Sequence, residues 1–332
     1  MSTMTVHLNR RALLTASAAA AILGTGTRSA FSPPTGKAPS SNPIFRDVFT
    51  ADPAALVYND RLYVYVGHDN AKEGQFFTMP GWRLYSSDDA KTWTSHGYIM
   101  RPENFAYGRT DVAWASQMVE KDGKFYFYVT LRLRDSQAHA IAVAVGHRPE
   151  GPFRDARGTP LITDDMTTDS RRTNADIDPT VYVDADGTPW MAWGNGDCYL
   201  ARLKRNMIEL DGPIQKLDLV NYAEGPWLFR RGDLYYNVYA GEFNGISPEH
   251  IGYSTAPAMR GPWTYRGLVT GPAKVGFTIH PAVIEFKGQW YFFYHDGSVS
   301  LNGIPGGDVR RSGGLQPFAF NPDGSIPFII QT

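Results

Sequence analysis

The 332-residue chain lacks several features that would point to common kinds of site. It has one cysteine, Cys198, which excludes an intramolecular disulfide and a cysteine-based zinc site. Its 32 basic and 33 acidic residues nearly cancel and form no block of one sign, so there is no electrostatic footprint for nucleic acid. A glycine-rich phosphate loop and a Gly-x-Ser-x-Gly nucleophile elbow are also missing. Other side chains must therefore carry any chemistry.

Turn-forming and aromatic residues, by contrast, are abundant. The chain holds 33 glycines and 23 prolines, together with 18 tyrosines, 18 phenylalanines and 8 tryptophans. A helical bundle would not tolerate so many helix breakers, so the composition excludes an all-α fold and favours short strands joined by turns.

The first 30 residues differ from the rest of the chain. They contain no Asp, Glu or Lys, and the pair Arg10-Arg11 precedes an alanine-rich apolar run that ends at about Gly24. This pattern is typical of a twin-arginine export signal, and the run is too short to span a bilayer. A buried helix is the alternative, but Ser-, Pro- and Gly-rich sequence follows. We expect a signal at 1–30, a linker at 31–41, and a periplasmic or extracellular protein with no membrane anchor in its mature form.

The remainder of the chain repeats one pattern five times. A turn and an aromatic strand follow a short apolar run each time, with turn positions at 60, 123, 187, 232 and 288. Two-residue turns between alternating runs predict β-hairpins, and several strands per repeat are typical of propeller blades. A β-sandwich would have no reason for five equivalent hairpins. The sequence therefore predicts an all-β fold, a single five-bladed β-propeller over residues 42–332.

Ionisable residues recur at one position of this repeat. The first strand of each blade should line the central channel, and we compare the residue eight places before each turn. The third hairpin looks one residue longer, which moves its position by one. The five positions then hold Asp52, Ala115, Asp178, Glu224 and His280. Asp-Pro and Glu-Gly-Pro could simply begin strands, but that explains one acid better than three in register.

Three carboxyl groups gathered in one channel indicate acid–base chemistry. Like charges in such a place raise the pKa of at least one carboxyl, as a general acid requires. One carboxyl to protonate a leaving oxygen and another to activate water are the requirements for glycoside hydrolysis.

At these residues the chain resembles glycoside hydrolase family 43, and the resemblance covers nearly all of 42–332. It rests on four motifs in order: Ala51-Asp52-Pro53-Ala54, Ile177-Asp178-Pro179-Thr180, Ala223-Glu224-Gly225-Pro226-Trp227 and Phe277-Thr278-Ile279-His280-Pro281. Gly67-His68-Asp69 and Met79-Pro80-Gly81-Trp82 are similar to the β-xylosidase and α-L-arabinofuranosidase branch, which acts on xylan-derived material. One departure is Trp114-Ala115-Ser116-Gln117, where many members have Pro and Asp after the Ala.

The resemblance implies an inverting mechanism with three carboxyl roles. Asp52 matches the base that activates water, Glu224 the general acid, and Asp178 the carboxylate that orients the acid and raises its pKa. Inversion implies a separation of about 6.5–9.5 Å between the carboxyls of Asp52 and Glu224.

The resemblance also implies residues that bind the sugar. Trp114 matches an aromatic wall, although ordinary blade packing would explain it too. Arg311 matches an arginine that binds sugar hydroxyls, with Arg310 as the alternative, and Phe76 with Phe77 is expected at the rim. His280 matches a channel histidine near a water-ligated calcium or other central ion. Any such contact would pass through water, because calcium prefers oxygen ligands, and hydrogen bonding alone explains this histidine equally well.

We therefore expect an exo-acting hydrolase that needs no cofactor for its chemistry and releases arabinofuranose, xylose or both from arabinoxylan or its oligosaccharides. The partner would be a plant cell-wall glycan. An endo-acting arabinanase of the same fold and a non-catalytic carbohydrate-binding propeller remain alternatives. A retaining fructosidase-like propeller would carry Arg and Cys where this chain has Ile177 and Gly225. The polar stretch 164–173 is expected to be a solvated loop, with a role in shaping the cavity entrance as the alternative.

Overall fold

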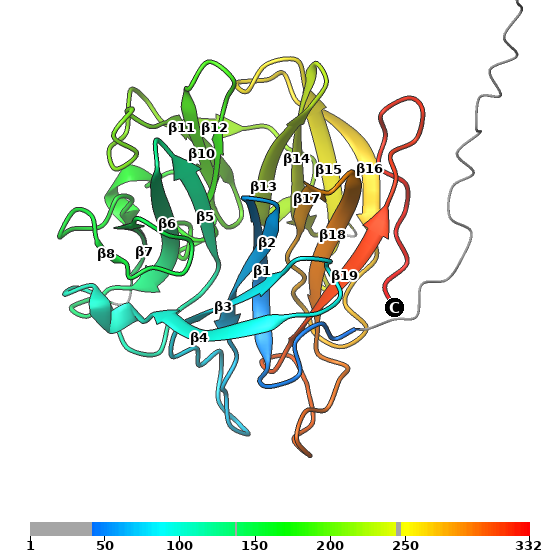
Figure 1. The fold of residues 1–332 in the computed structure, drawn as a ribbon. Coiled ribbons are helices and arrows are strands. Elements are labelled where there is room, and N and C mark those ends of the chain that lie inside the picture. Colours follow the sequence, from blue (N-terminus) through cyan, green and yellow to red (C-terminus); the bar gives the residue numbers. More distant parts are fainter. Residues whose placement is uncertain (1–41, 137, 244–246) are drawn as a thin grey trace, which may run out of the picture. The chain divides into compact units, whose positions relative to one another are not determined.

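The computed structural model describes residues 42–136, 138–243 and 247–332, and the predicted export signal and linker lie outside them. Five antiparallel sheets account for nearly all the regular structure of this part (Figure 1). None of its helices is long and apolar enough to cross a membrane.

Each sheet is a meander in which consecutive strands pair. The strands of the first two sheets are β1 (Thr50–Tyr58), β2 (Arg61–His68), β3 (Trp82–Ser87), β4 (Thr94–Met100), then β5 (Ser116–Lys121), β6 (Lys124–Arg132), β7 (His139–Gly146) and β8 (Arg154–Asp155). The third sheet consists of β9 (Thr180–Val183), β10 (Pro189–Trp193), β11 (Cys198–Arg202) and β12 (Gln215–Leu217). The last two comprise β13 (Tyr222–Arg231), β14 (Leu234–Gly241), β15 (His250–Ala256), β16 (Thr264–Thr270), then β17 (Ala282–Phe286), β18 (Gln289–Asp296) and β19 (Ser312–Phe318). Two short 3₁₀ helices, Pro102–Asn104 and Asp164–Met166, lie in connections.

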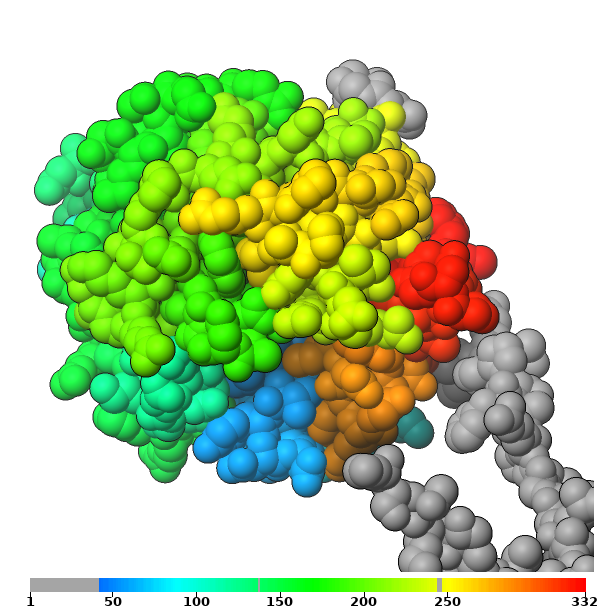
Figure 2. Space-filling model, turned by 90° about the horizontal axis from the view of Figure 1, so that it is seen from above, coloured from blue at the N-terminus to red at the C-terminus, as the bar shows by residue number. Residues whose placement is uncertain are grey.

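The five sheets close into a ring. The first strands contact one another in the cyclic order β1, β5, β9, β13, β17 and back to β1. In the space-filling view the sequence colours follow one another around the molecule, and the blue first blade meets the orange fifth blade (Figure 2). The predicted five-bladed β-propeller is therefore confirmed.

The hairpins that identified the blades have the expected local chemistry. Tyr58 pairs with Arg61 around Asn59 and Asp60, whose φ angles are 48° and 56°. Positive φ suits Asn, Asp and Gly, and this turn type matches the twist of the flanking strands. The third hairpin is longer, as expected, because Val183 pairs with Pro189 across a wider connection.

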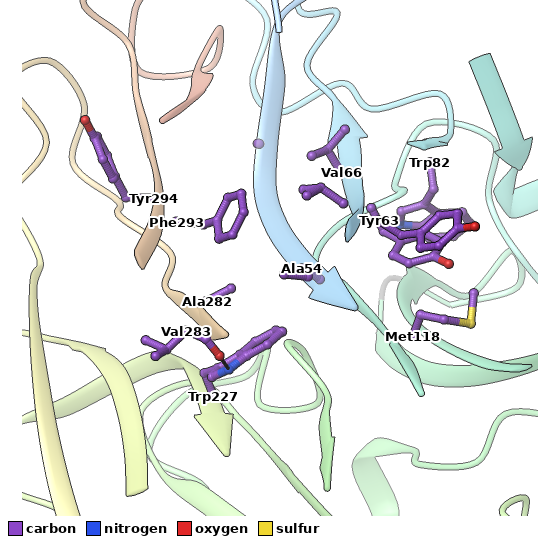
Figure 3. Close-up of a cluster of buried hydrophobic side chains, with 14 of the residues drawn as sticks. Ala54, Tyr63, Val66, Trp82, Met118, Trp227, Ala282, Val283, Phe293 and Tyr294 are labelled. Atoms are coloured by element: carbon purple, nitrogen blue, oxygen red, sulfur yellow. Dashed lines mark hydrogen bonds between the residues drawn. The ribbon is translucent and has the colours of Figure 1, made fainter. Parts of the chain in front are cut away.

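Buried apolar side chains fill the space between neighbouring blades (Figure 3). Trp227 of β13 lies beside Ala282 and Val283 of β17, and its indole Nε1 donates to the Val283 carbonyl at 2.8 Å. Each is at most 5% exposed. This packing fixes the separation of adjacent inner strands, and therefore the positions of the side chains at their channel ends.

The segment that precedes β1 joins the last blade to the first. The Ile44 amide donates to the Gly313 carbonyl at 2.9 Å, and the Leu315 amide donates to Asn42 Oδ1 at 2.9 Å. Asn42 Nδ2 also donates to Thr332 Oγ1 at 3.1 Å. These bonds extend the three-stranded fifth sheet along β19, and we call them the ring seam.

Candidate active site

Two of the predicted carboxyls occupy equivalent backbone positions at the start of their blades. Asp52 and Asp178 each precede a proline and have φ angles of 54° and 60°. This left-handed conformation is uncommon outside glycine, and Asp tolerates it better than most residues. Because the same conformation occurs at Asp52 and Asp178, the two residues are equivalent, and the one-residue shift made for the longer third turn was correct.

Glu224 reaches the channel by a different route from the one expected. Arg231 pairs with Leu234 in the fourth hairpin, so the true counterpart of Asp52 is Gly225, with φ +59°, rather than Glu224. A Cβ on Gly225 would lie 2.9 Å from His280 Nδ1, so that position has no room for a side chain. Register shifts on both sides of Glu224 bulge the strand and turn this acid toward the channel.

A cavity of about 320 Å³ opens at this end of the channel. All the residues that the sequence assigned to the site line it, apart from the alternative Arg310. The lining residues are Asp52, Phe76, Phe77, Trp114, Arg172, Asn174, Ile177, Asp178, Asn195, Glu224, Glu242, Ser247, Glu249, Phe277, Thr278, His280 and Arg311.

Asp52 is buried and surrounded by positive or polar groups. Its Oδ1 lies 3.3 Å from Arg311 Nη1 and 3.2 Å from His295 Nδ1. Burial alone would raise its pKa, but the charge of Arg311 and the contact with His295 outweigh burial and hold the pKa well below its usual range. Asp52 is therefore ionised at neutral pH.

Glu224 and Asp178 experience the opposite balance. Burial, reinforced by the negative charge of Asp52, raises the pKa of Glu224 to about 7, although Arg172 and Arg311 oppose the rise. Burial and the charges of Glu224 and Asp52 raise the pKa of Asp178 well above its usual range. The Gly225 amide donates to Asp178 Oδ2 at 3.1 Å. The cavity thus holds one strongly acidic carboxyl beside two that keep their protons longer.

A further carboxyl of the cavity, Glu249, was missed by the sequence comparison. It is 5% exposed, lines the cavity just before β15, and accepts a hydrogen bond from the Ile279 amide at 3.2 Å. Burial and the charges of Glu224 and Asp178 raise its pKa well above the usual range. No signal in the repeat could have found it, because it precedes the third strand of its blade rather than the first.

Arg311 is fixed by a second carboxylate, also outside the repeat. Asp69 accepts from Arg311 Nε at 2.8 Å, from Nη2 at 3.0 Å and from the Arg311 backbone amide at 2.9 Å. Both side chains are at most 5% exposed. Arg310, the sequence alternative, instead donates to the Pro305 carbonyl at 2.7 Å.

Aromatic rings form one wall of the cavity. The Phe77 ring lies 4.6 Å from Phe76, 5.8 Å from Phe277 and 6.1 Å from Trp114, and the Arg311 guanidinium lies 4.4 Å above it. Phe76 is 64% exposed and Phe277 is 37% exposed. Trp114 stacks on His139 at 4.4 Å while still facing the cavity. Such surfaces suit the apolar face of a sugar ring.

His280 lies in the cavity wall, where burial lowers its pKa to about 4, so the ring is neutral at neutral pH. Within the described residues, no group of three or more His, Cys, Asp or Glu side chains could hold a metal ion. Because calcium prefers oxygen ligands, the side chains present do not form a direct calcium site and fit only an ion that keeps its water shell.

The polar stretch 164–173 is not wholly a solvated loop, because Thr167 is buried and Arg172 reaches the cavity, as the alternative interpretation allowed. Arg172 lines the cavity, donates to Asn195 Oδ1 at 2.6 Å and pairs with Glu242 Oε1 at 2.8 Å. The sequence could not reveal this, because the partners lie in other loops.

Comparisons with known proteins agree with this geometry. The model of the glycosyl hydrolases family 43 matches residues 40–326. A xylosidase/arabinosidase from Humicola insolens is 26% identical, over 86% of this chain and 98% of that protein. An arabinoxylan arabinofuranohydrolase from Bacillus subtilis is 30% identical, over 86% of this chain and 63% of that protein.

Solved structures lead to the same family. A family 43 β-xylosidase/α-arabinofuranosidase from a compost microbial metagenome, in a calcium-free complex with xylotriose, superposes with a TM-score of 0.74 at 25% identity, covering 86% of this chain and 96% of the other. An α-L-arabinofuranosidase from Clostridium thermocellum gives a TM-score of 0.71 at 30% identity, covering 87% and 96%. The chain therefore belongs to glycosyl hydrolase family 43 and is a glycoside hydrolase with a five-bladed β-propeller fold.

Proposed function

We propose that this enzyme removes terminal L-arabinofuranose or D-xylose units from arabinoxylan or its oligosaccharides by an inverting mechanism. Asp52 acts as the base that activates water, Glu224 protonates the leaving oxygen, and Asp178 keeps Glu224 protonated and in place. One observation carries the proposal: two carboxyls of the same cavity have pKa values displaced in opposite directions. An acid–base pair needs one carboxyl that is ionised and another that keeps its proton.

The protonation states support these roles at neutral pH. Ionised Asp52 can accept a proton from a water molecule, while Glu224, with a pKa of about 7, is substantially protonated and can donate. As Glu224 loses its proton to the departing sugar, negative charge develops near Arg311, whose Nη1 already neutralises Asp52. The neutral ring of His280 and the aromatic wall bind the sugar without adding charge.

The preference for terminal pentose units is supported by the relatives, which include a xylosidase/arabinosidase and an α-L-arabinofuranosidase. The cavity of about 320 Å³, walled by Trp114 and Phe77, suits a sugar unit rather than a long groove. An endo-acting arabinanase would instead release oligosaccharides from the interior of debranched arabinan, which product analysis distinguishes.

The first test measures free arabinose and xylose released from arabinoxylan and from the two matching aryl glycosides. Asp52→Asn is the control, and we expect its release to fall by at least about 1000-fold while sugar binding persists. NMR of the first product formed should show the inverted anomer. Release that persists in Asp52→Asn, or a retained anomer, would refute the assigned mechanism. Binding without any release would favour the carbohydrate-binding alternative.

The acid role of Glu224 has its own test. Glu224→Gln should lose much less activity on aryl glycosides with good leaving groups than on natural linkages, because a good leaving group needs little protonation. Equal losses on both substrates would reject Glu224 as the acid.

Export by a twin-arginine route is part of the same proposal, supported by Arg10-Arg11 and the apolar run after them. Replacement of both arginines by lysine should leave the enzyme in the cytoplasmic fraction of an expressing bacterium. Unchanged export would refute that route.

A further inference from the structure

Glu224 is held by a chain of polar side chains that begins at the cavity mouth. Asn195 Nδ2 donates to Glu224 Oε2 at 3.1 Å, Arg172 Nη1 donates to Asn195 Oδ1 at 2.6 Å, and Arg172 Nη2 pairs with Glu242 Oε1 at 2.8 Å. Asn195 is 4% exposed, whereas the side chains of Arg172 and Glu242 are 35% and 31% exposed. The chain thus connects the partly solvated mouth to the proposed acid.

We infer that Arg172 is a positioning residue for Glu224, acting through Asn195 and anchored by Glu242. The inference rests on the proposed function in so far as Glu224 is the acid. A guanidinium has only donors, so the Asn195 amide must turn its oxygen toward Arg172 and its nitrogen toward Glu224. The amide N–H then engages Oε2, which leaves Oε1 to carry the proton that the substrate receives.

The backbone is shaped to admit the Arg172 side chain. Gly196 has a φ of +82°, and a Cβ there would lie 2.9 Å from Arg172 Cγ and 3.2 Å from Cδ. The Gly196 amide also donates to the Ala223 carbonyl, next to Glu224, at 2.6 Å. The stem of Arg172 therefore lies against the residue that follows Asn195 and bonds to the residue that precedes Glu224.

Neighbouring Arg171 provides a matched control. It belongs to the same loop, its Nε donates to Asp197 Oδ1 at 3.0 Å and its Nη2 donates to the Gly196 carbonyl, but none of its bonds reaches the side chain of Asn195. Its side chain is 67% exposed, and it does not line the cavity. Loss of Arg171 should disturb the loop and the Gly196 backbone while leaving the side-chain bonds from Arg172 to Asn195 and from Asn195 to Glu224 in place.

Several charged or titratable groups face Glu224 from different parts of the fold. They are Asp52, Arg172, Asp178, Glu242, Glu249, His280 and Arg311. Within this set, Arg172 lowers and Glu242 raises the pKa of Glu224. Removal of the Arg172 charge should therefore raise the pKa of Glu224, and removal of the Glu242 charge should lower it. A purely structural role of the ion pair would not produce shifts of opposite sign.

The experiment compares Arg172→Gln, Glu242→Gln and Arg171→Gln with the unmodified enzyme in pH profiles of kcat/KM at low salt. We expect the alkaline limb to move up by roughly half a pH unit or more in Arg172→Gln and down by a similar amount in Glu242→Gln. Arg171→Gln should leave the limb unchanged. Arg172→Lys keeps the positive charge, so its alkaline limb should lie where that of the unmodified enzyme does. Its kcat on natural linkages should still be lower than that of the unmodified enzyme, because lysine cannot bond to Asn195 and Glu242 with the two nitrogens of a guanidinium group.

A direct titration separates this inference from the proposed function. The carboxyl of Glu224 in ¹³C-glutamate-labelled protein, assigned by its loss in Glu224→Gln, should titrate higher in Arg172→Gln and lower in Glu242→Gln. Those shifts would support the positioning role even if the leaving-group test rejected Glu224 as the acid. Shifts in the same direction, or none in folded variants, would overturn the inference.

Discussion

The raised pKa of Glu224 carries a cost in folding stability that a single substitution should reveal. Below pH 4.5, the ordinary pKa of Glu, this residue is protonated in both the folded and the unfolded chain and contributes nothing. As the pH rises from there to about 7, the folded chain keeps a proton that the unfolded chain has released, so the free energy of unfolding falls. Above about 7 the penalty is complete.

The size of this penalty follows from the two pKa values. A difference between 4.5 and about 7 corresponds to roughly 3 kcal/mol, and water that reaches the partly exposed carboxyl reduces this to about 2–3 kcal/mol. Glu224→Gln removes the charge while keeping the shape and an acceptor for Asn195. The Glu224→Gln variant should therefore be more stable than the unmodified enzyme by about 2–3 kcal/mol at pH 8, and by at most about 1 kcal/mol at pH 5.

Equilibrium urea unfolding at both pH values measures this difference. Glu285→Gln, at an exposed position of β17, is the matched control and should change the stability by the same small amount at pH 5 and pH 8. A stability gain for Glu224→Gln that is equal at the two pH values, or a loss at pH 8, would refute the reasoning.

Other predictions follow from the cavity walls. Asp69→Asn should destabilise the fold by about 3–5 kcal/mol in urea unfolding, because it leaves the buried Arg311 without one of its two carboxylate partners. The control Asp211→Asn breaks a 2.9 Å ion pair between side chains that are about half exposed, and it should cost at most about 1 kcal/mol. Similar losses in the two variants would show that burial does not decide the cost. Trp114→Ala should raise KM for aryl pentosides by about 3–10-fold with a smaller effect on kcat, and an unchanged KM would remove it from the sugar site. If a hydrated calcium ion sits beside His280, chelation should lower the Tm and calcium should restore it, and an unchanged Tm and activity would exclude the ion.

How far the sequence could lead depended on whether a residue belonged to the repeat. Asp52 and Asp178 were found together because each lies directly before a proline near the start of an inner strand, at the same position of the repeat. The residue equivalent to Asp52 in the fourth blade is Gly225, so the comparison that selected Glu224 was one residue out of register. That position needs a glycine because it lies beside His280, and the strand bulges so that the preceding residue supplies the acid. Glu224 was nevertheless selected because the turn position chosen in the fourth hairpin was itself one residue too early.

Residues outside the repeat could not be found in this way. Asp69 lies 242 positions from Arg311 along the chain, and Arg172 lies 70 positions from Glu242. Such pairs depend on how loops of different blades meet at the channel mouth, which no local period records. Asp69 entered only within a motif of the resemblance, and Glu249 gave no signal.

The ring seam has a consequence for how the enzyme loses activity. The two sides of the seam are held together by backbone and side-chain bonds between residues 42–50 and 311–315, without a covalent link. The Thr50 amide donates to the carbonyl of Arg311 itself, two residues before Asp52. Opening of the seam would therefore separate the arginine from the base while the other blades remain folded. In a heating series we expect catalytic activity to be lost at a lower temperature than most of the β-structure. The highest temperature at which the enzyme works would then be set by the ring seam rather than by the whole core.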